Sequence, residues 1–153
     1  FWLMGGLTYI TKEDVLIMLI PFAISIVPLM LLRWRLNVLS LDDEEAESLG
    51  VDTKKLRLAV IICATLMSSA SVAAGGMIGW VGLIVPHIAR MISGPDYTKM
   101  LPCSVLTGAI FLLIMDDLSR CLFAQEIPLG VLTAIIGAPF FLYLLFRGKK
   151  SFM

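Results

Sequence analysis

Residues 58–89 read LAVIICATLMSSASVAAGGMIGWVGLIVPHIA, a run of 32 residues without a single Lys, Arg, Asp or Glu. A helix crosses the hydrocarbon core of a bilayer with about 20 apolar residues, so this run is too long for one span. The pair Gly75–Gly76 lies inside the run and is its natural break, because adjacent glycines interrupt a helix. The run therefore predicts two membrane-spanning helices, near 57–74 and 78–92.

Three further apolar segments extend this pattern along the chain. They cover residues 15–32, 101–122 and 127–146, and the middle one reaches full length only by including charged residues near its end. Of the 153 residues, 59% are hydrophobic and 16% charged, against about 25% charged in a soluble domain. The sequence predicts an all-α fold: a polytopic membrane helix bundle of about five transmembrane helices.

The charges predict how these helices are oriented. Ten of the twelve Lys and Arg residues fall in the loop 33–57, the loop 90–100 and the C-terminal tail, whereas Lys12 and Arg120 fall on the other side. Loops rich in Lys and Arg stay in the cytoplasm, so the long loop and the C-terminus are expected there. The formal net charge is zero, which argues against a nucleic-acid binder.

The long hydrophilic loop, 36–55, contains a predicted short helix at about 42–49. Asp42 and Glu45 have the spacing of a capping box, and the acidic first turn suits the positive end of the helix dipole. Gly50 is placed to end the helix in a left-handed conformation. Ala46 and Leu49, with Leu41 beside them, would form a small apolar face. The helix is then either a docking element for a soluble partner or part of a solvated connector.

Few other residues indicate chemistry. Cys63, Cys103 and Cys121 are isolated among apolar residues and are interpreted as small buried hydrophobic residues. His87 has no Cys or carboxylate at ligand spacing and is interpreted as a structural hydrogen-bonding residue, not a metal ligand. The sequence contains no phosphate-binding loop, and it predicts no metal site, cofactor or catalytic site.

Three stretches resemble one family in order and spacing. They are LNVLSLDDEEAESLGV (36–51), GGMIGWVGLIVPHIARMISGPDYTKMLP (75–102) and EIPLGVLTAIIGAPFFLYLLFRGKK (126–150). Together they look like the C-terminal half of the FecCD/BtuC-like type II ABC importer permeases. Members of that family import iron–siderophores, haem, cobalamin and related metal chelates.

The resemblance implies a fold and a set of partners. A full member has ten helices and works as a dimer of identical or different permease subunits, so residues 1–153 would be the last five helices and would lack an N-terminal half. The chain begins with Phe1 in an apolar segment, which also suggests that it is cut from a longer one. The location implied is a bacterial or archaeal inner membrane. ATP would be hydrolysed by separate cytoplasmic ABC ATPase subunits.

The resemblance also implies roles for individual residues. The loop would form the coupling helix that contacts the ATPase through Asp43, Glu44, Glu45, Ala46, Leu49 and Gly50. Gly82, Pro86, His87 and Arg90 would mark the inner end of the family's signature helix.

Arg120 would contact an acidic residue of an extracytoplasmic substrate-binding protein. Asp116 and Asp117 share its helix at pairing distances, so an intrahelical ion pair that neutralises the arginine is the alternative.

Two other functions stay open. A secondary transporter fragment driven by an ion gradient would need ionisable groups near the midplane of the membrane, and only Asp116 and Asp117 come close. The second alternative function is a membrane scaffold without transport activity. The sequence does not select the cargo.

Overall fold

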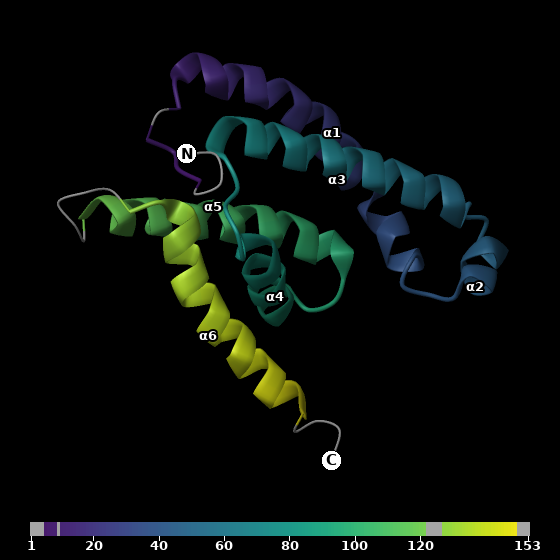
Figure 1. Ribbon diagram of the computed structural model, residues 1–153. Coiled ribbons are helices and arrows are strands. Elements are labelled where there is room, and N and C mark those ends of the chain that lie inside the picture. Colours follow the sequence, from purple (N-terminus) through teal and green to yellow (C-terminus); the bar gives the residue numbers. More distant parts are fainter. Residues whose placement is uncertain (1–4, 9, 122–126, 150–153) are drawn as a thin grey trace.

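Every regular element in the described part of the chain is an α-helix, as the sequence predicts (Figure 1). The computed structural model describes residues 5–8, 10–121 and 127–149. The helices are α1 (Lys12–Val38), α2 (Asp43–Ser48), α3 (Thr53–Gly75), α4 (Val81–Ser93), α5 (Tyr97–Cys121) and α6 (Leu129–Lys149).

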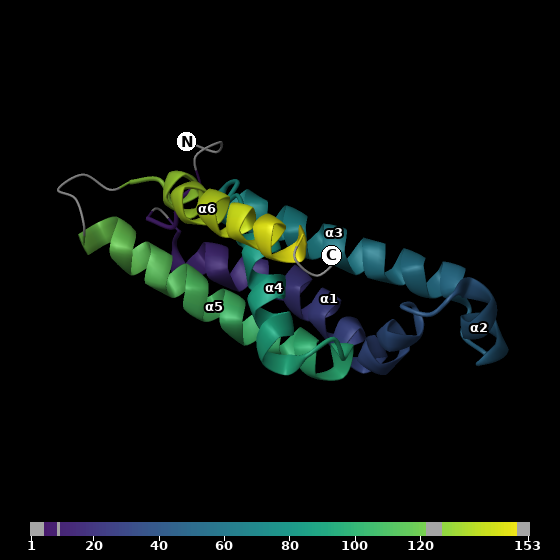
Figure 2. The same ribbon diagram turned by 90° about the horizontal axis from the view of Figure 1, so that it is seen from below.

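The helices are arranged as two antiparallel pairs with α6 added to one of them. α1 packs along α3, α4 packs along α5, and α1 also contacts α5. α6 begins beside the end of α5 and then runs away from the α1–α3 pair, as Figure 1 shows, while Figure 2 shows α2 projecting beyond the helix ends. α2 therefore lies outside the packed helices, at one end of the molecule.

Three helices in the described residues are long and apolar enough to cross a membrane: α1 with 27 residues, α3 with 23 and α5 with 25. α4 has only 13 residues, a rise of about 20 Å against a hydrocarbon core of about 30 Å. It begins at Val81 instead of the expected residue 78, whereas α5 begins four residues before the expected span. The helices also extend beyond the predicted spans elsewhere, since α1 ends six residues later than expected and α3 begins four residues earlier.

The connection from α3 to α4 explains why α4 is short. α3 ends at Gly75, and Gly76 has a positive φ of 72°, so the predicted break at this glycine pair is present. The chain then stays non-helical up to Trp80. Gly75 accepts a hydrogen bond from the amide of Gly6, 2.9 Å away, and Ile78 packs against the cluster of Met115, Leu129 and Leu132. Contacts from distant parts of the chain hold this connection in place.

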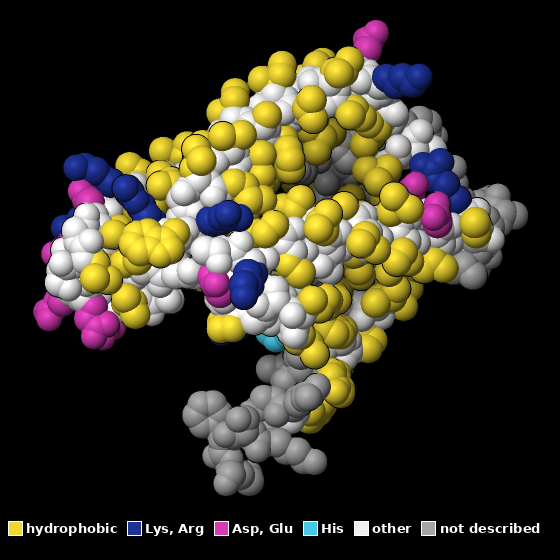
Figure 3. Space-filling view, turned by 180° about the vertical axis from the view of Figure 1, so that it is seen from behind, with side chains coloured by type: hydrophobic (Ala, Val, Ile, Leu, Met, Phe, Trp, Pro, Cys, Tyr) yellow, Lys and Arg dark blue, Asp and Glu magenta, His cyan; other side chains and the backbone are white. Residues whose placement is uncertain are grey.

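Charged side chains gather at the ends of the helices and an apolar band lies between them (Figure 3). The apolar side chains of the band are widely exposed, for example Leu31 at 79% and Ile20 at 63%. Exposed apolar surface of this extent needs lipid or another protein to cover it.

Candidate functional site

α2 is anchored to the helices that flank it. Ala46 is fully buried and packs with Val38 of α1, with Val51 just before α3 and with Leu56 of α3. This cluster makes α2 a firmly held element and not a loose connector.

The C-terminal end of α2 is closed by the glycine that the sequence predicts. Gly50 has a φ of 77°. Its amide donates to the carbonyl of Glu47 over 2.9 Å, and the amide of Val51 donates to the carbonyl of Ala46 over 3.2 Å. These two bonds form a Schellman motif, and the buried Val51 adds the apolar contact that accompanies it.

The predicted capping box at the start of α2 is wrong. Asp42 is the N-cap residue, but its side chain makes no capping hydrogen bond. The carboxylates of Asp42 and Glu45 are both solvent-exposed, where water competes with the backbone amides. The packing of Ala46 and the Schellman motif, not a capping box, hold the helix.

The outward surface of α2 is acidic, with apolar residues beside it. Asp43, Glu44 and Glu45 are exposed, and Leu49 is 60% and Leu41 43% exposed. The predicted apolar face is therefore only partly present, because Ala46 points into the chain and does not join the two leucines. A firmly held, solvent-facing surface of this kind suits docking of a soluble protein with complementary basic and apolar groups.

Two ion pairs tie this region to α3, and sequence reasoning missed both. Arg57 lies 3.3 Å from Asp43, and Lys55 lies 3.0 Å from Asp52. Asp52 also caps α3, because its carboxylate accepts a 3.1 Å hydrogen bond from the amide of Lys55. The hydrogen bonds from the Lys55 backbone, and then from its side chain, lower the pKa of Asp52. The sequence did contain a signal for the cap of α3, because Asp52 stands directly before the helix-forming residues 53–57.

The four predicted residues of the signature helix share one exposed side of α4. Gly82, Pro86, His87 and Arg90 are exposed, whereas Ile84, Val85 and Ala89 are buried on the opposite side.

The expected hydrogen-bonding role of His87 is not found, because its ring bonds to none of the described residues. The three cysteines also differ from expectation: Cys63 and Cys103 are half-buried and Cys121 is exposed. The described residues include no group of three His, Cys, Asp or Glu side chains arranged to hold a metal ion.

Arg120 pairs with Asp116 one turn earlier on α5. Its Nε lies 3.0 Å from Oδ2 and its Nη2 3.3 Å from Oδ1, so the guanidinium engages both carboxylate oxygens. The arginine side chain is still 45% exposed. The intrahelical pair is therefore present, and the arginine also faces the surface at the end opposite α2.

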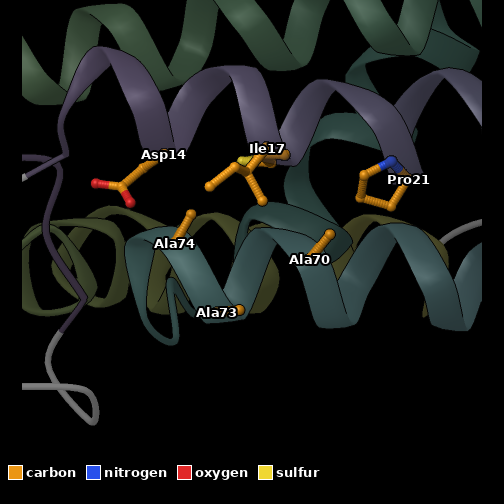
Figure 4. A pocket seen from close by; sticks show the side chains of 7 residues that line it. Asp14, Ile17, Pro21, Ala70, Ala73 and Ala74 are labelled. Atoms are coloured by element: carbon orange, nitrogen blue, oxygen red, sulfur yellow. The ribbon is translucent and has the colours of Figure 1, made fainter.

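A groove of about 220 Å³ lies between α1 and α3 near that same end. Figure 4 shows Asp14, Ile17 and Pro21 of α1 above Ala70 and Ala74 of α3. The Asp14 carboxylate accepts hydrogen bonds from the amide and hydroxyl of Thr11, at 2.9 and 2.7 Å. Asp14 thus belongs to the capping box of α1, and the small alanines allow the two helices to approach closely.

Comparison with known proteins decides the family. Residues 1–147 match the model of the FecCD transport family. The chain belongs to that family. Together with the three long apolar helices, membership makes it a multi-pass membrane protein.

Individual relatives agree with this assignment. The chain is 44% identical over 153 residues to the molybdate import system permease protein MolB of Haemophilus influenzae, covering all of this chain and 45% of MolB. It is 43% identical over 153 residues to the Fe(3+)-citrate import system permease protein YfmE of Bacillus subtilis, covering 98% of this chain and 46% of YfmE.

A solved structure has the same fold. A metal-chelate type ABC transporter in an inward-facing conformation matches with a TM-score of 0.91 and 44% identity, over 95% of this chain and 47% of that one. The chain thus spans about half the length of the relatives that it matches.

Proposed function

We propose that this chain is the C-terminal half, residues 1–153, of the transmembrane permease of an ABC importer, and that it moves a metal-containing solute driven by ATP hydrolysis on separate subunits. The observation that carries the proposal is α2, a short helix fixed to two long apolar helices and presenting an acidic surface beyond them. A motor protein outside the membrane can displace such an element as a unit, whereas a loose loop would absorb the displacement.

The proposed coupling surface consists of Asp43, Glu44, Glu45, Leu49 and Gly50, with Ala46 as its buried anchor. Its partner would be a cytoplasmic ABC ATPase. The chain itself would have no catalytic site.

The distribution of Lys and Arg residues indicates which end of the molecule faces the cytoplasm. Asn37 contacts Asp96, so the ends of α1 and α4 and the starts of α3 and α5 share one end with α2, and most of the cations lie there. Lys12 and Arg120 lie at the other end. We place the α2 end and the C-terminus in the cytoplasm and the opposite end outside the bacterial or archaeal inner membrane.

Further partners follow from the proposed assembly. An extracytoplasmic substrate-binding protein would dock at Arg120, while the N-terminal half, a second permease subunit and lipid would cover the exposed apolar band. The cargo is a metal chelate or a metal oxyanion. Relatives of nearly equal identity import molybdate and ferric citrate, so identity alone does not choose between them.

Transport by the full permease, reconstituted in vesicles with its ATPase and binding protein, tests the proposal. Replacing Glu44 and Glu45 by alanine should lower ATP-driven uptake and ATPase stimulation at least about tenfold, the size expected when charged contacts are lost. Glu13→Ala, an exposed acid at the opposite end, is the control and should change neither. Unchanged uptake in the double variant would show that α2 is not the coupling surface.

The same vesicles test the secondary-transporter alternative. Asp116, its best candidate for an ion site, lies in the last turns of α5 and already pairs with Arg120. Uptake that continues without ATPase and follows an ion gradient would favour that alternative over the importer.

A further inference from the structure

A hydrogen-bonded network joins the last turn of α1 to the start of α5, 59 residues further along the chain. The Asn37 side-chain amide donates from Nδ2 to Oδ1 of Asp96 over 2.7 Å. The oxygen of the same amide accepts a 2.8 Å hydrogen bond from the Tyr97 amide. Asn37 thus uses both its donor and its acceptor on the α4–α5 connection.

Asp96 is held in turn by the helix that follows it. Its Oδ1 accepts a 2.9 Å bond from the Thr98 amide, and its carbonyl accepts bonds from the amides of Lys99 and Met100. Hydrogen bonds from the Thr98 side chain, then Asn37, then the Thr98 backbone lower the pKa of Asp96 from 3.8 to about 2. A lowered pKa means that these bonds favour the fold above about pH 4 and are lost as the pH falls toward 2. At neutral pH the bond from Asn37 therefore has a charged acceptor.

The network lies where the coupling loop meets the rest of the bundle. Val38, the residue after Asn37, belongs to the cluster that anchors α2 through Ala46. Asp96 belongs instead to the turn between α4 and α5. The two halves of the network therefore sit on different helix pairs.

Side-chain packing between these pairs is incomplete at the same level. A mostly apolar cavity of about 400 Å³ lies there, lined by Leu36 of α1, Val60 of α3, Pro86 of α4 and Tyr97 of α5. Across a cavity, apolar contacts transmit little force, because the lining atoms have no partner on one side. Beside it, the Asn37–Asp96 network forms a short, directional link, and a longer hydrogen bond of 3.4 Å runs from Nη1 of Arg33 to the Thr98 carbonyl.

We infer that Asn37 and Asp96 are positioning residues that transmit displacement of α2 to α4 and α5 through their direct hydrogen bond. The inference rests on the proposed function, since it assigns the route by which the coupling surface acts on the membrane helices.

The two side chains are nearly isosteric, which provides a sharp test. Asn37→Asp alone sets two carboxylates against each other and breaks the bond. Adding Asp96→Asn restores it, because the new amide donates to the new carboxylate and Tyr97 keeps its acceptor. The Thr98 amide loses its acceptor in this double variant, because the atom that faces residue 37, Oδ1 in native Asp96, is also the atom that accepts from Thr98. Asp96→Asn alone leaves a neutral version of the same bond.

The experiment uses the full permease with its ATPase and binding protein in vesicles, and it measures cargo imported per ATP hydrolysed together with ATPase affinity. Asn37→Asp should lower this ratio at least about tenfold, the loss of one hydrogen bond to a charged group, while ATPase affinity stays native. The double swap should raise the ratio at least about threefold above that of Asn37→Asp, as expected for two residues whose effects are coupled. Full recovery is not expected, because the Thr98 amide is left without its acceptor. Asn37→Ser, whose side chain is too short for both contacts, replaces Asn37→Asp if that variant fails to assemble.

Two results would overturn the inference: a native ratio in Asn37→Asp, or a ratio in the double swap that is no higher than in Asn37→Asp. The Glu44 and Glu45 alanine variant is measured alongside. If that variant is fully active, the coupling surface itself is wrong. If it is inactive while Asn37→Asp couples normally, only the route through Asn37 and Asp96 is wrong.

Discussion

Trp80 carries the unusual backbone of the α3–α4 connection. It is the one residue other than glycine with a positive φ, 66°, in the described part of the chain. A bulky residue in that conformation is strained and needs surroundings that hold it. α6 supplies them: Gly137 lies directly against the Trp80 side chain, and Phe141 packs edge-on with ring centroids 6.2 Å apart.

We predict that Gly137→Ala destabilises the full permease. A Cβ at residue 137 would lie 2.6 Å from the Trp80 Cβ and 2.7 Å from its Cγ, so either α6 or Trp80 must shift. Overpacking of this kind costs about 1–3 kcal/mol, which would lower the midpoint of thermal unfolding in detergent. Gly79→Ala is the matched control, because a Cβ there meets nothing within 4 Å. Equal midpoints for the two variants would mean that α6 does not hold Trp80.

At the scale of one element, α2 depends on how its last turn is closed. We predict that Gly50→Ala frays this end without any steric clash, since a Cβ at residue 50 meets nothing within 4 Å. The cost is conformational: an L-residue in the left-handed region loses about 1–2 kcal/mol. Hydrogen exchange of the Gly50 and Val51 amides in the full permease should accelerate about tenfold or more.

Gly50→Asn separates conformation from side-chain contact in that experiment. Asparagine tolerates the left-handed region better than alanine, so its exchange rates should fall between those of native and alanine proteins. If alanine leaves both amides protected, the Schellman motif does not limit opening of α2.

Elements with a strong local signal were predictable from the sequence. The uncharged runs predicted α1, α3 and α5 because apolar length is a property of consecutive residues, and the predicted helix at 42–49 differs from α2 by one residue at each end. The Gly75–Gly76 break is equally local. Gly50 was placed correctly because a left-handed cap needs only the right residue at the right position.

Features that depend on distant contacts were not predictable. The shortness of α4 depends on packing of the 76–80 connection against residues near position 6 and against α6. Nothing in the sequence around Asn37 indicates its bond to Asp96, because the two residues are 59 positions apart and meet only in the folded chain. The capping box of α2 was predicted from a correct local spacing, but it does not form. Asp42 and Glu45 are both exposed, so water competes with the backbone amides for their carboxylates.

At the scale of the whole molecule, the chain has two charged ends with different surroundings. The α2 end combines acids with most of the cations, whereas Lys12 and Arg120 lie at the far end of α1 and α5. The apolar band between the ends is open on much of its surface, as Figure 3 shows. The arrangement agrees with the proposed permease, whose two ends would meet different soluble partners.

The far end carries the last prediction, that Arg120→Glu weakens capture of the binding protein by the full permease. The guanidinium is bound side-on by Asp116 yet remains 45% exposed, so it is held in one geometry while still reachable from outside. A pre-positioned arginine suits a carboxylate on a partner. Reversing it should reduce affinity at low salt at least about tenfold, and high salt should shrink the difference.

Two matched variants separate docking from general charge effects. Lys12→Glu makes the same charge change on an exposed residue at the same end, and it should reduce affinity by less than about threefold because it alters only the long-range field. Asp116→Asn removes the neutralising partner and should leave capture intact or strengthen it. If Arg120→Glu and Lys12→Glu lower the affinity for the binding protein equally, Arg120 acts only through the overall charge of this end and makes no specific contact. Loss of capture in Asp116→Asn would instead show that the ion pair, as a unit, forms the contact.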